Sequence, residues 1–518
     1  MPNILSVYPQ FPDSFWSFKY ALPFIHKKAV MPPLGLLTIP NVLPTSFYKH
    51  KVVDLNVEPL KDNDLRNADI VFTSAMLVQK DSMYEVVDRA HNKKIPIVAG
   101  GPFPSLYTED IKRDIPGKVT HFFHGQVLDG RLLEFFDDLK KGGAREVYAQ
   151  GETPETNQQT LLNAPPPLYS LVDLNNYASV GIQFSAGCPF KCKFCEIPEL
   201  FGDRTVTKTD EQMLAECEIL FLRGWRGSVF FVDDNFIGNK IRVLQFLPKL
   251  AQWQQERGYP FSFYTQASVN LVEIEGLPEM MVRAGFGMVF LGIETVNPNT
   301  LRATGKNQNT KKKEGGYDNN YLIESIRSLQ KIGLQVTCGL ITGLDGDDEN
   351  VFDQHIDFVQ TSGIGMVMDG ILAIIKGAPW YNQYKSEGRL VEESVGNNTS
   401  LHVNFIPKNM TKEKLVEGYK RVLATIYDPR LKNYFERCFI AFEHSTYTGH
   451  NGRSIGLTEL RAFWLSICKQ LFSRQGPAYA KFLWKVFRKD YRMIPEAVEQ
   501  AIKGYSLQKV TKRMVTSL

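Results

Sequence analysis

The sequence contains few cysteines, no long apolar run and almost no excess charge. Its 518 residues include seven cysteines, most of them isolated, which argues against a disulfide framework and favours the reducing cytoplasm. No apolar stretch approaches the ~20 residues of a membrane span, and the N-terminus lacks the pattern of a secretory signal. With 60 Lys and Arg against 56 Asp and Glu, the net charge of +4 gives no support for nucleic-acid binding.

The pattern of apolar segments predicts several domains, because 518 residues exceed one ordinary core. In residues 1–140, short apolar runs alternate with segments of helical period, which predicts a doubly wound (Rossmann-like) parallel sheet. Residues 141–178 are polar and then proline-rich, as in a linker. Residues 179–395 alternate again and predict a whole or partial (β/α) barrel with function at the strand carboxyl ends. Residues 396–518 show helical periodicity and predict a mainly helical domain.

Three cysteines lie close together in SAGCPFKCKFCEIP, residues 185–198: Cys188, Cys192 and Cys195. Zinc would need a fourth ligand, but Cys217 lies in a predicted helix and no histidine lies within 50 residues on either side. A disulfide would leave one thiol over. Thiolates are the usual ligands of iron–sulfur clusters, and three can hold a [4Fe–4S] cluster with one iron open. Three unrelated buried cysteines are the alternative.

The motif CPFKCKFC, with an aromatic residue before its third cysteine, resembles the cluster motif of radical S-adenosylmethionine (SAM) enzymes. The resemblance covers residues 179–395. It implies that the open iron binds the amino and carboxylate groups of SAM, whose reductive cleavage yields a 5′-deoxyadenosyl radical. By position, Cys188, Cys192 and Cys195 would bind the cluster, and Phe194 would lie near the adenine of SAM.

Three further segments resemble SAM-contacting segments of that family. FVDDNFIGN offers Asp233, Asp234 and Asn235 as contacts to the SAM amino group. LGIET offers Glu294 as an acidic contact, and GLITGLDGD offers Gly343, where backbone would approach the adenine. Caps or turns are the alternative for the acidic and amide side chains, which favour such positions.

The first domain resembles cobalamin-binding domains. Ser74 fits the Ser-x-hydrophobic position after the third predicted strand, and Gly100 and Gly101 fit the glycine pair after the fourth. Glycine there lets backbone approach a bulky nucleotide tail. The Asp-x-His-x-x-Gly motif that supplies a histidine to cobalt does not occur in the first domain. We therefore predict cobalamin without a protein imidazole on cobalt.

Longer segments, including FWSFKYALPFIHKKAVMPPLGLLTIPNVLP and NFIPKNM, resemble the branch that contains hopanoid C-2 methylases and bacteriochlorophyllide side-chain methylases. Two departures, Gln126 in place of a usual Glu and Ala186 in place of a common Arg, concern cobalamin contacts and substrate choice. The resemblance implies a cobalamin-dependent radical SAM C-methyltransferase acting on an unactivated carbon of an apolar polycyclic molecule. It also implies an electron donor such as flavodoxin or ferredoxin.

Three other functions stay open at this point. A cobalamin-binding radical SAM enzyme can catalyse a ring closure or rearrangement instead of methylation, and a corrinoid or cluster sensor would not turn over. A tRNA methylthiotransferase is disfavoured, because the chain has no second cysteine trio.

Two further predictions concern the C-terminal helices and one lysine-rich segment. Apolar residues in 463–472 share one predicted helical face, and those in 482–487 share another, which Lys and Arg flank. Core packing is the simpler interpretation of these faces, and peripheral contact with a membrane is the other. The segment GKNQNTKKKEGGYDNN, residues 305–320, is rich in Gly, Asn and Lys, so we expect its lysine run to lie in a solvated loop.

Overall fold

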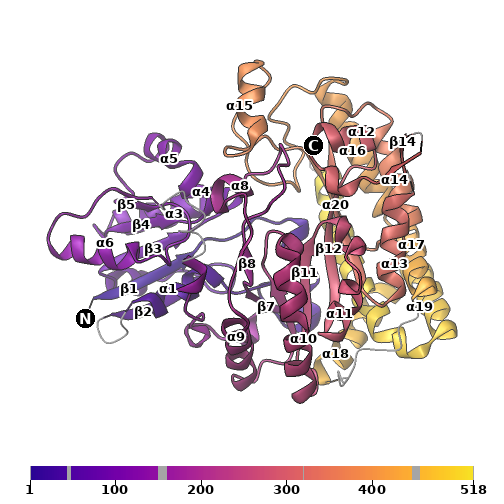
Figure 1. Ribbon diagram of the computed structural model, residues 1–518, viewed down its shortest axis with the longest axis horizontal. Helices are drawn as coiled ribbons and strands as arrows, with labels where there is room; N and C mark the ends of the chain where they lie inside the picture. Colours follow the sequence, from indigo (N-terminus) through magenta and orange to yellow (C-terminus); the bar gives the residue numbers. More distant parts are fainter. Residues whose placement is uncertain are drawn as a thin grey trace.

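The computed structural model describes residues 2–43, 48–149, 160–314, 316–318, 320–445 and 456–516. Within these ranges the main strands form two six-stranded parallel sheets, and C-terminal helices pack beside the second sheet (Figure 1). This arrangement confirms the predicted fold class: a doubly wound sheet, a partial barrel and a helical C-terminal region. The predicted domain boundaries stay predictions.

The first sheet has the strand order β2-β1-β3-β4-β5-β6 and carries helices on both faces. Separate clusters of buried apolar side chains lie under α3 (Lys80–His91) and under α6 (Arg131–Lys140), one on each face. Strands covered on both sides need continuous apolar sequences, which explains the runs in this part of the chain. The strands are β2 (Lys49–Asp54), β1 (Asn3–Tyr8), β3 (Ile70–Ser74), β4 (Ile97–Gly100), β5 (His121–Phe123) and β6 (Val147–Tyr148).

The second sheet keeps sequence order, β16-β15-β12-β11-β10-β7. Within the described residues its two edge strands do not pair with each other, so the barrel is partial. Crossover helices join the strands, among them α9 (Asp210–Leu222), which begins at a capping box of Thr209 and Gln212. The strands are β7 (Ser179–Ile182), β10 (Ser228–Phe231), β11 (Ser262–Ala267), β12 (Phe286–Glu294), β15 (Gln335–Thr342) and β16 (Val367–Ile371).

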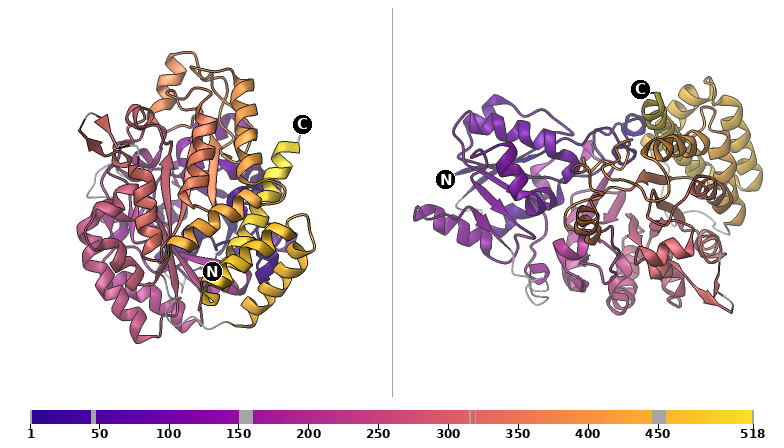
Figure 2. Two further views of the ribbon diagram at one scale, coloured as in Figure 1. Left: turned by 90° about the vertical axis from the view of Figure 1, so that its right-hand side faces the viewer. Right: turned by 90° about the horizontal axis from the view of Figure 1, so that it is seen from above.

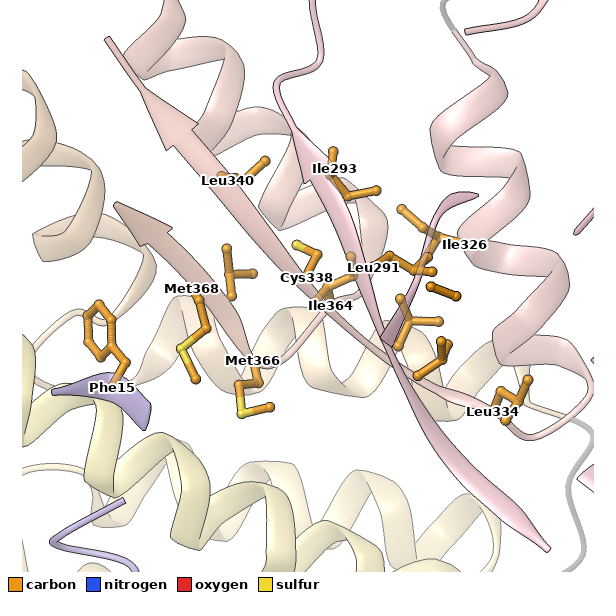
Figure 3. Close-up of a cluster of buried hydrophobic side chains, with 14 of the residues drawn as sticks. Phe15, Leu291, Ile293, Ile326, Leu334, Cys338, Leu340, Ile364, Met366 and Met368 are labelled. Carbon is orange, nitrogen blue, oxygen red and sulfur yellow. The ribbon is translucent and has the colours of Figure 1, made fainter. Parts of the chain in front are cut away.

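The barrel core continues into the C-terminal helices. Leu291 of β12, Cys338 of β15 and Met368 of β16 belong to a cluster that also contains Tyr434 and Phe482 (Figure 3). Cys338 is therefore a core residue. The C-terminal helices are α16 (Lys412–Ile426), α17 (Lys432–His444), α18 (Leu457–Ser466), α19 (Gly476–Lys489) and α20 (Ile494–Thr516).

The predicted shared faces of the C-terminal helices were partly wrong. Helix α18 ends at Ser466, and a π-helical turn, Ile467–Leu471, follows it. This turn changes the helical period, so residues 463–472 do not share one face. In α19, Phe482 and Val486 are buried, whereas Phe487 is 56% exposed.

The long loop between β1 and α1 (Leu34–Val42) leaves the first sheet and packs against both the barrel and the C-terminal helices. Phe15 lies in the barrel core, and its backbone N–H donates to Thr399 Oγ1 at 3.2 Å. Phe24 packs with Val498 and Ile502 of α20. In Figure 2 this indigo segment lies beside the yellow C-terminal helices. None of the described helices is both long and apolar enough to cross a bilayer.

Candidate cofactor and substrate site

A cavity of ≈ 1970 Å³ lies between the first sheet, the inner side of the partial barrel and the C-terminal helices. Its volume is about twice the upper end of the usual range for ligand pockets, roughly 300–1,000 Å³. It therefore has room for more than one ligand. Its lining combines side chains from every region: Tyr8, Ser74 and Met76 of the first domain; Trp16 and Met31 of the long loop; Tyr264, Gln266 and Phe290 of the barrel; Phe442, Phe463 and Ile502 of the C-terminal helices.

Ser74, Gly100 and Gly101 come together at the carboxyl edge of the first sheet. Ser74 ends β3 and lines the cavity, and Gly100 ends β4. Gly101 follows with a φ of +89°, and a Cβ there would lie 2.6 Å from Ser74 Oγ. Only glycine permits both this backbone conformation and this close approach. The two glycines thus fix the position of the Ser74 loop, and contact of these residues with cobalamin stays a prediction.

Two histidines of the first domain, one at the start of β5 and one directly after it, have other partners. His121 Nδ1 lies 2.7 Å from the Arg145 carbonyl oxygen, and His124 Nε2 lies 2.7 Å from Thr108 Oγ1. Burial lowers the pKa of His124. Among the histidines that the structure describes, none lines the cavity. Cobalamin without a protein imidazole on cobalt stays a prediction.

The cysteine loop, residues 188–195, is held on both sides by backbone contacts. Gly187 has a φ of +83°, and a Cβ there would lie 2.5 Å from the Arg204 carbonyl oxygen. On the other side, the Lys193 N–H donates to the Thr304 carbonyl oxygen at 2.9 Å. The loop therefore has a defined shape without a disulfide.

The three thiols of this loop are largely buried. Cys192 is 7% exposed, and Cys188 and Cys195 are partly exposed. Burial raises the pKa of all three thiols, and the nearby Lys306 cation acts in the opposite direction. As placed, no group of three His, Cys, Asp or Glu side chains among the described residues could hold one metal ion. A four-iron cluster takes one thiolate per iron, so its ligands need not converge on one point, and three thiols on one loop fit it.

Asp234 and Asn235 follow β10 and tie neighbouring loops together. Asp234 Oδ2 accepts the Gly187 N–H at 2.9 Å, directly beside the cysteine loop. Asn235 Nδ2 donates to Ser268 Oγ, which follows β11, at 3.1 Å. Burial raises the pKa of Asp234 to about 6 and that of Asp233 to about 7. Asp233 also has a partner, the Ser185 N–H, so all three predicted SAM contacts have structural partners, and their roles toward SAM stay predictions.

Glu294 forms a nearly buried ion pair with a residue that the sequence reasoning missed. Lys306 Nζ lies 2.8 Å from Glu294 Oε1, and the two side chains are 12% and 11% exposed. Burial alone would lower the pKa of Lys306, but Glu294 and the neighbouring thiols raise it above its ordinary value. Glu294 has a φ of +66°, which is rare for a residue other than glycine and marks a local strain typical of functional positions.

Residues 305–320 differ in exposure along the segment. The lysine run at 311–313 is exposed as expected, whereas the Lys306 side chain is only 12% exposed. Asn309 is 1% exposed and donates to the Gly292 carbonyl oxygen at 2.7 Å. A polar composition favours an exposed loop, yet the buried carboxylate that ends β12 requires a cation. The need of Glu294 for a nearby cation was the feature of the sequence that indicated a buried lysine.

Phe194 and Gly343 pack against different side chains. The Phe194 ring centroid is 6.3 Å from that of Trp380. Gly343 has a φ of +97°, and a Cβ there would lie 3.0 Å from the Leu415 side chain of α16. Packing against α16 is thus sufficient to require glycine at 343, and contact of either residue with SAM stays a prediction.

Comparison with known proteins identifies the family. The profile described as "Radical SAM superfamily" matches residues 182–359, and a profile described as "Domain of unknown function (DUF4070)" matches residues 379–518. An uncharacterized methyltransferase of Synechocystis sp. is 36% identical over 442 residues, covering 84% of this chain and 78% of that protein. The hopanoid C-2 methylase of Rhodopseudomonas palustris is 32% identical over 438 residues, covering 83% and 78%. The bacteriochlorophyllide d C-12(1)-methyltransferase of Chlorobaculum tepidum is 23% identical over 408 residues, covering 77% and 83%.

Two solved structures share the fold. The radical SAM enzyme OxsB, described as cobalamin-dependent and solved with aqua-cobalamin and SAM, has a TM-score of 0.62 at 14% identity and covers 100% of this chain and 84% of its own. The radical SAM methyltransferase TsrM of Kitasatospora setae, solved with cobalamin and a [4Fe–4S] cluster, has a TM-score of 0.57 at 15% identity and covers 76% and 80%.

The fold and the cysteine loop define an enzyme of the radical SAM class, which uses a [4Fe–4S] cluster and SAM. Within it, the chain belongs to the methyltransferase family that includes the hopanoid C-2 methylase. This membership confirms the resemblance predicted from CPFKCKFC and from the longer segments.

Proposed function

We propose that this enzyme is a cobalamin-dependent radical SAM C-methyltransferase that methylates an unactivated carbon of an apolar polycyclic substrate, either hopanoid-like or chlorin-like. The observation that carries the proposal is the shared cavity. Ser74 lines it from the first domain, and Glu196, which directly follows Cys195, lines it beside the cysteine loop. A ligand on the first sheet and a ligand on the cysteine loop would therefore face the same space.

In this proposal the chain binds and aligns its cofactors. When bound, the cluster and SAM supply a carbon-centred radical, and cobalamin supplies a methyl group. Cys188, Cys192 and Cys195 hold the cluster, and Asp234 fixes the loop that carries them through the Gly187 N–H. The aromatic side chains that line the cavity offer apolar faces to the ligands. No side chain is required as a nucleophile.

The barrel lining supports an apolar, flat substrate. The rings of Phe230 and Tyr264 stack with centroids 4.7 Å apart, and the rings of Trp16 and Phe290 lie 5.2 Å apart. The Tyr264 hydroxyl lies 3.0 Å from Ser179 Oγ, so its polar group has a partner within the wall. Aromatic faces with internally satisfied polar groups favour apolar rings over polar ligands.

The partners and the location are part of the proposal. A flavodoxin or ferredoxin is the proposed electron donor, and nucleic acid is not a proposed partner. We place the enzyme in the cytoplasm. The alternative function, a ring closure or rearrangement with the same cofactors, differs only in its product.

The test uses the enzyme reconstituted anaerobically with iron, sulfide and cobalamin, then supplied with SAM, reductant and a hopanoid or chlorin extract. We expect both 5′-deoxyadenosine and S-adenosylhomocysteine, together with a product heavier by one methyl group. Deoxyadenosine with a product of unchanged carbon number would establish the alternative. If neither nucleoside forms, a catalytic function is refuted.

Cobalamin bound to this enzyme is expected to lack an axial histidine. Electron paramagnetic resonance of the cob(II)alamin form should show no nitrogen hyperfine splitting from a lower ligand, because His121 and His124 bond elsewhere. The variants His121→Ala and His124→Ala should leave the spectrum unchanged. A clear imidazole splitting that disappears in either variant would contradict this prediction.

Gly101→Ala is expected to weaken cobalamin binding roughly tenfold or more, equivalent to about 1.4 kcal/mol. The added Cβ would lie 2.6 Å from Ser74 Oγ and 3.0 Å from the Ala75 carbonyl oxygen, so the Ser74 loop has to move. Gly117→Ala is the matched control, because Gly117 has a φ of +68° but no atom within 4 Å of its added Cβ. Equal losses in the two variants, measured by cobalamin titration, would attribute the effect to backbone strain alone.

A further inference from the structure

The cavity reaches the surface beside the C-terminal helices. Leu460 and Phe463 of α18 line the cavity and are 57% and 38% exposed. Arg492 of η10 (Tyr491–Met493) and Glu499 of α20 also line it and are exposed. These four side chains define the opening of the cavity at this end, which we call the C-terminal opening.

Two exposed apolar stripes reach the C-terminal opening. On α18, Trp464 is 65% exposed and lies one helical turn from Leu460 of the opening. On α19, Trp484 and Phe487 are 59% and 56% exposed, and Tyr491, next to Arg492 of the opening, is 67% exposed. Trp484 and Phe487 are three residues apart and lie on one side of α19, and Tyr491 follows the end of this helix in η10. Clustered exposed apolar side chains of this size mark interaction surfaces.

The same segment carries a net positive charge larger than that of the whole chain. Residues 457–493 contain eight Lys or Arg and two Asp or Glu, a net charge of +6. Since the whole chain carries +4, the remainder carries −2. The basic side chains alternate with the aromatic ones, and the Arg488 guanidinium lies 5.9 Å from the Trp484 ring. The segment is therefore complementary to a surface that is apolar inside and anionic outside.

We propose that α18, α19 and η10 dock on an anionic lipid bilayer, so that the C-terminal opening faces the membrane and admits the substrate from it. Trp and Tyr favour the interface between hydrocarbon and water, and helices with an apolar face and flanking basic residues lie in that interface. Attraction to anionic lipid adds to the burial of the aromatic side chains. The substrate entry rests on the proposed function, whereas the docking does not.

Flotation of the full-length protein with vesicles tests the docking. The vesicles contain phosphatidylcholine alone or with phosphatidylglycerol, at low and at physiological salt. We expect binding to the anionic vesicles that weakens as salt rises. Trp484→Ser with Phe487→Ser should reduce the partition coefficient roughly tenfold or more. Lys481→Glu with Arg488→Glu should reduce it at low salt, while the melting temperature of both variants holds.

A matched control carries equally exposed apolar residues elsewhere. Leu222 and Ile241 are 75% and 64% exposed and lie on α9 and on α10 (Lys240–Glu256), which belong to the barrel region. Leu222→Ser with Ile241→Ser should leave vesicle binding unchanged.

Three results would overturn the docking: no binding of the unmodified protein to anionic vesicles at low salt, equal loss in the control variant, or equal binding to neutral vesicles. If this surface binds a protein rather than lipid, the unmodified protein will not bind anionic vesicles at low salt, which is the first of these results. Product formation from detergent-dispersed substrate without vesicle binding would refute the docking and leave the proposed function intact.

Discussion

Replacing Cys188, Cys192 and Cys195 together by alanine is expected to abolish the binding of iron and sulfide, and with it the reductive cleavage of SAM. The three thiols are the ones on a single ordered loop, with Gly187 and Lys193 holding its two sides. A cluster that loses all its thiolate ligands has no attachment to the protein. Iron and sulfide analysis, with deoxyadenosine formation, measures the effect.

The other cysteines supply controls for this result. Cys468 is exposed, so Cys468→Ala should retain about four irons per chain, as a [4Fe–4S] cluster requires. Cys217 and Cys438 are buried in the core and should affect stability rather than iron content. Retention of about four irons in the triple variant would contradict the assignment, and loss of iron in Cys468→Ala would weaken it.

Lys306→Met should lower the free energy of unfolding by roughly 3 kcal/mol, because it leaves the buried Glu294 carboxylate without its cation. Lys306 and Glu294 are 12% and 11% exposed, so solvent screens their attraction little. Combining Lys306→Met with Glu294→Gln should recover most of the loss, since no buried charge then remains unpaired. Urea denaturation of the reconstituted enzyme under anaerobic conditions measures both changes.

Lys312→Met is the matched control for the ion pair, because Lys312 lies in the same segment and is exposed. It should leave the free energy of unfolding within about 0.5 kcal/mol of that of the unmodified enzyme. An unchanged midpoint in Lys306→Met, or a double variant as unstable as the single one, would show that the pair is not coupled as described.

Much of the fold was predictable because buried parallel strands require continuous apolar runs. The runs around Val71 and Val98 are fully covered by helices on both faces, and the sequence shows this as uninterrupted apolar residues. The strand order was not predictable in the same way, because it depends on which strands meet across the sheet. The place of Phe15 in the barrel core likewise depends on a loop whose path has no periodic signal.

The candidate site likewise contains residues that the sequence predicted and residues that it did not. The cysteine loop was predictable, since its thiols lie within eight residues of one another. Lys306 was not, because its partner Glu294 is 12 residues away and its neighbours are polar. Trp484 on the exposed side of α19 was also missed, because the helical period alone does not tell which side of α19 packs on α17 and α20.

The central claim is that this enzyme adds one methyl group to an apolar polycyclic molecule. Its most direct test is anaerobic expression in a host that makes hopanoids or chlorins, grown with methyl-deuterated methionine, followed by mass spectrometry of the extracted lipids and pigments. We predict a hopanoid or chlorin heavier by one deuterated methyl group, absent when the triple cysteine variant is expressed. Extracts identical for both proteins, from cells in which the unmodified enzyme cleaves SAM, would contradict the claim.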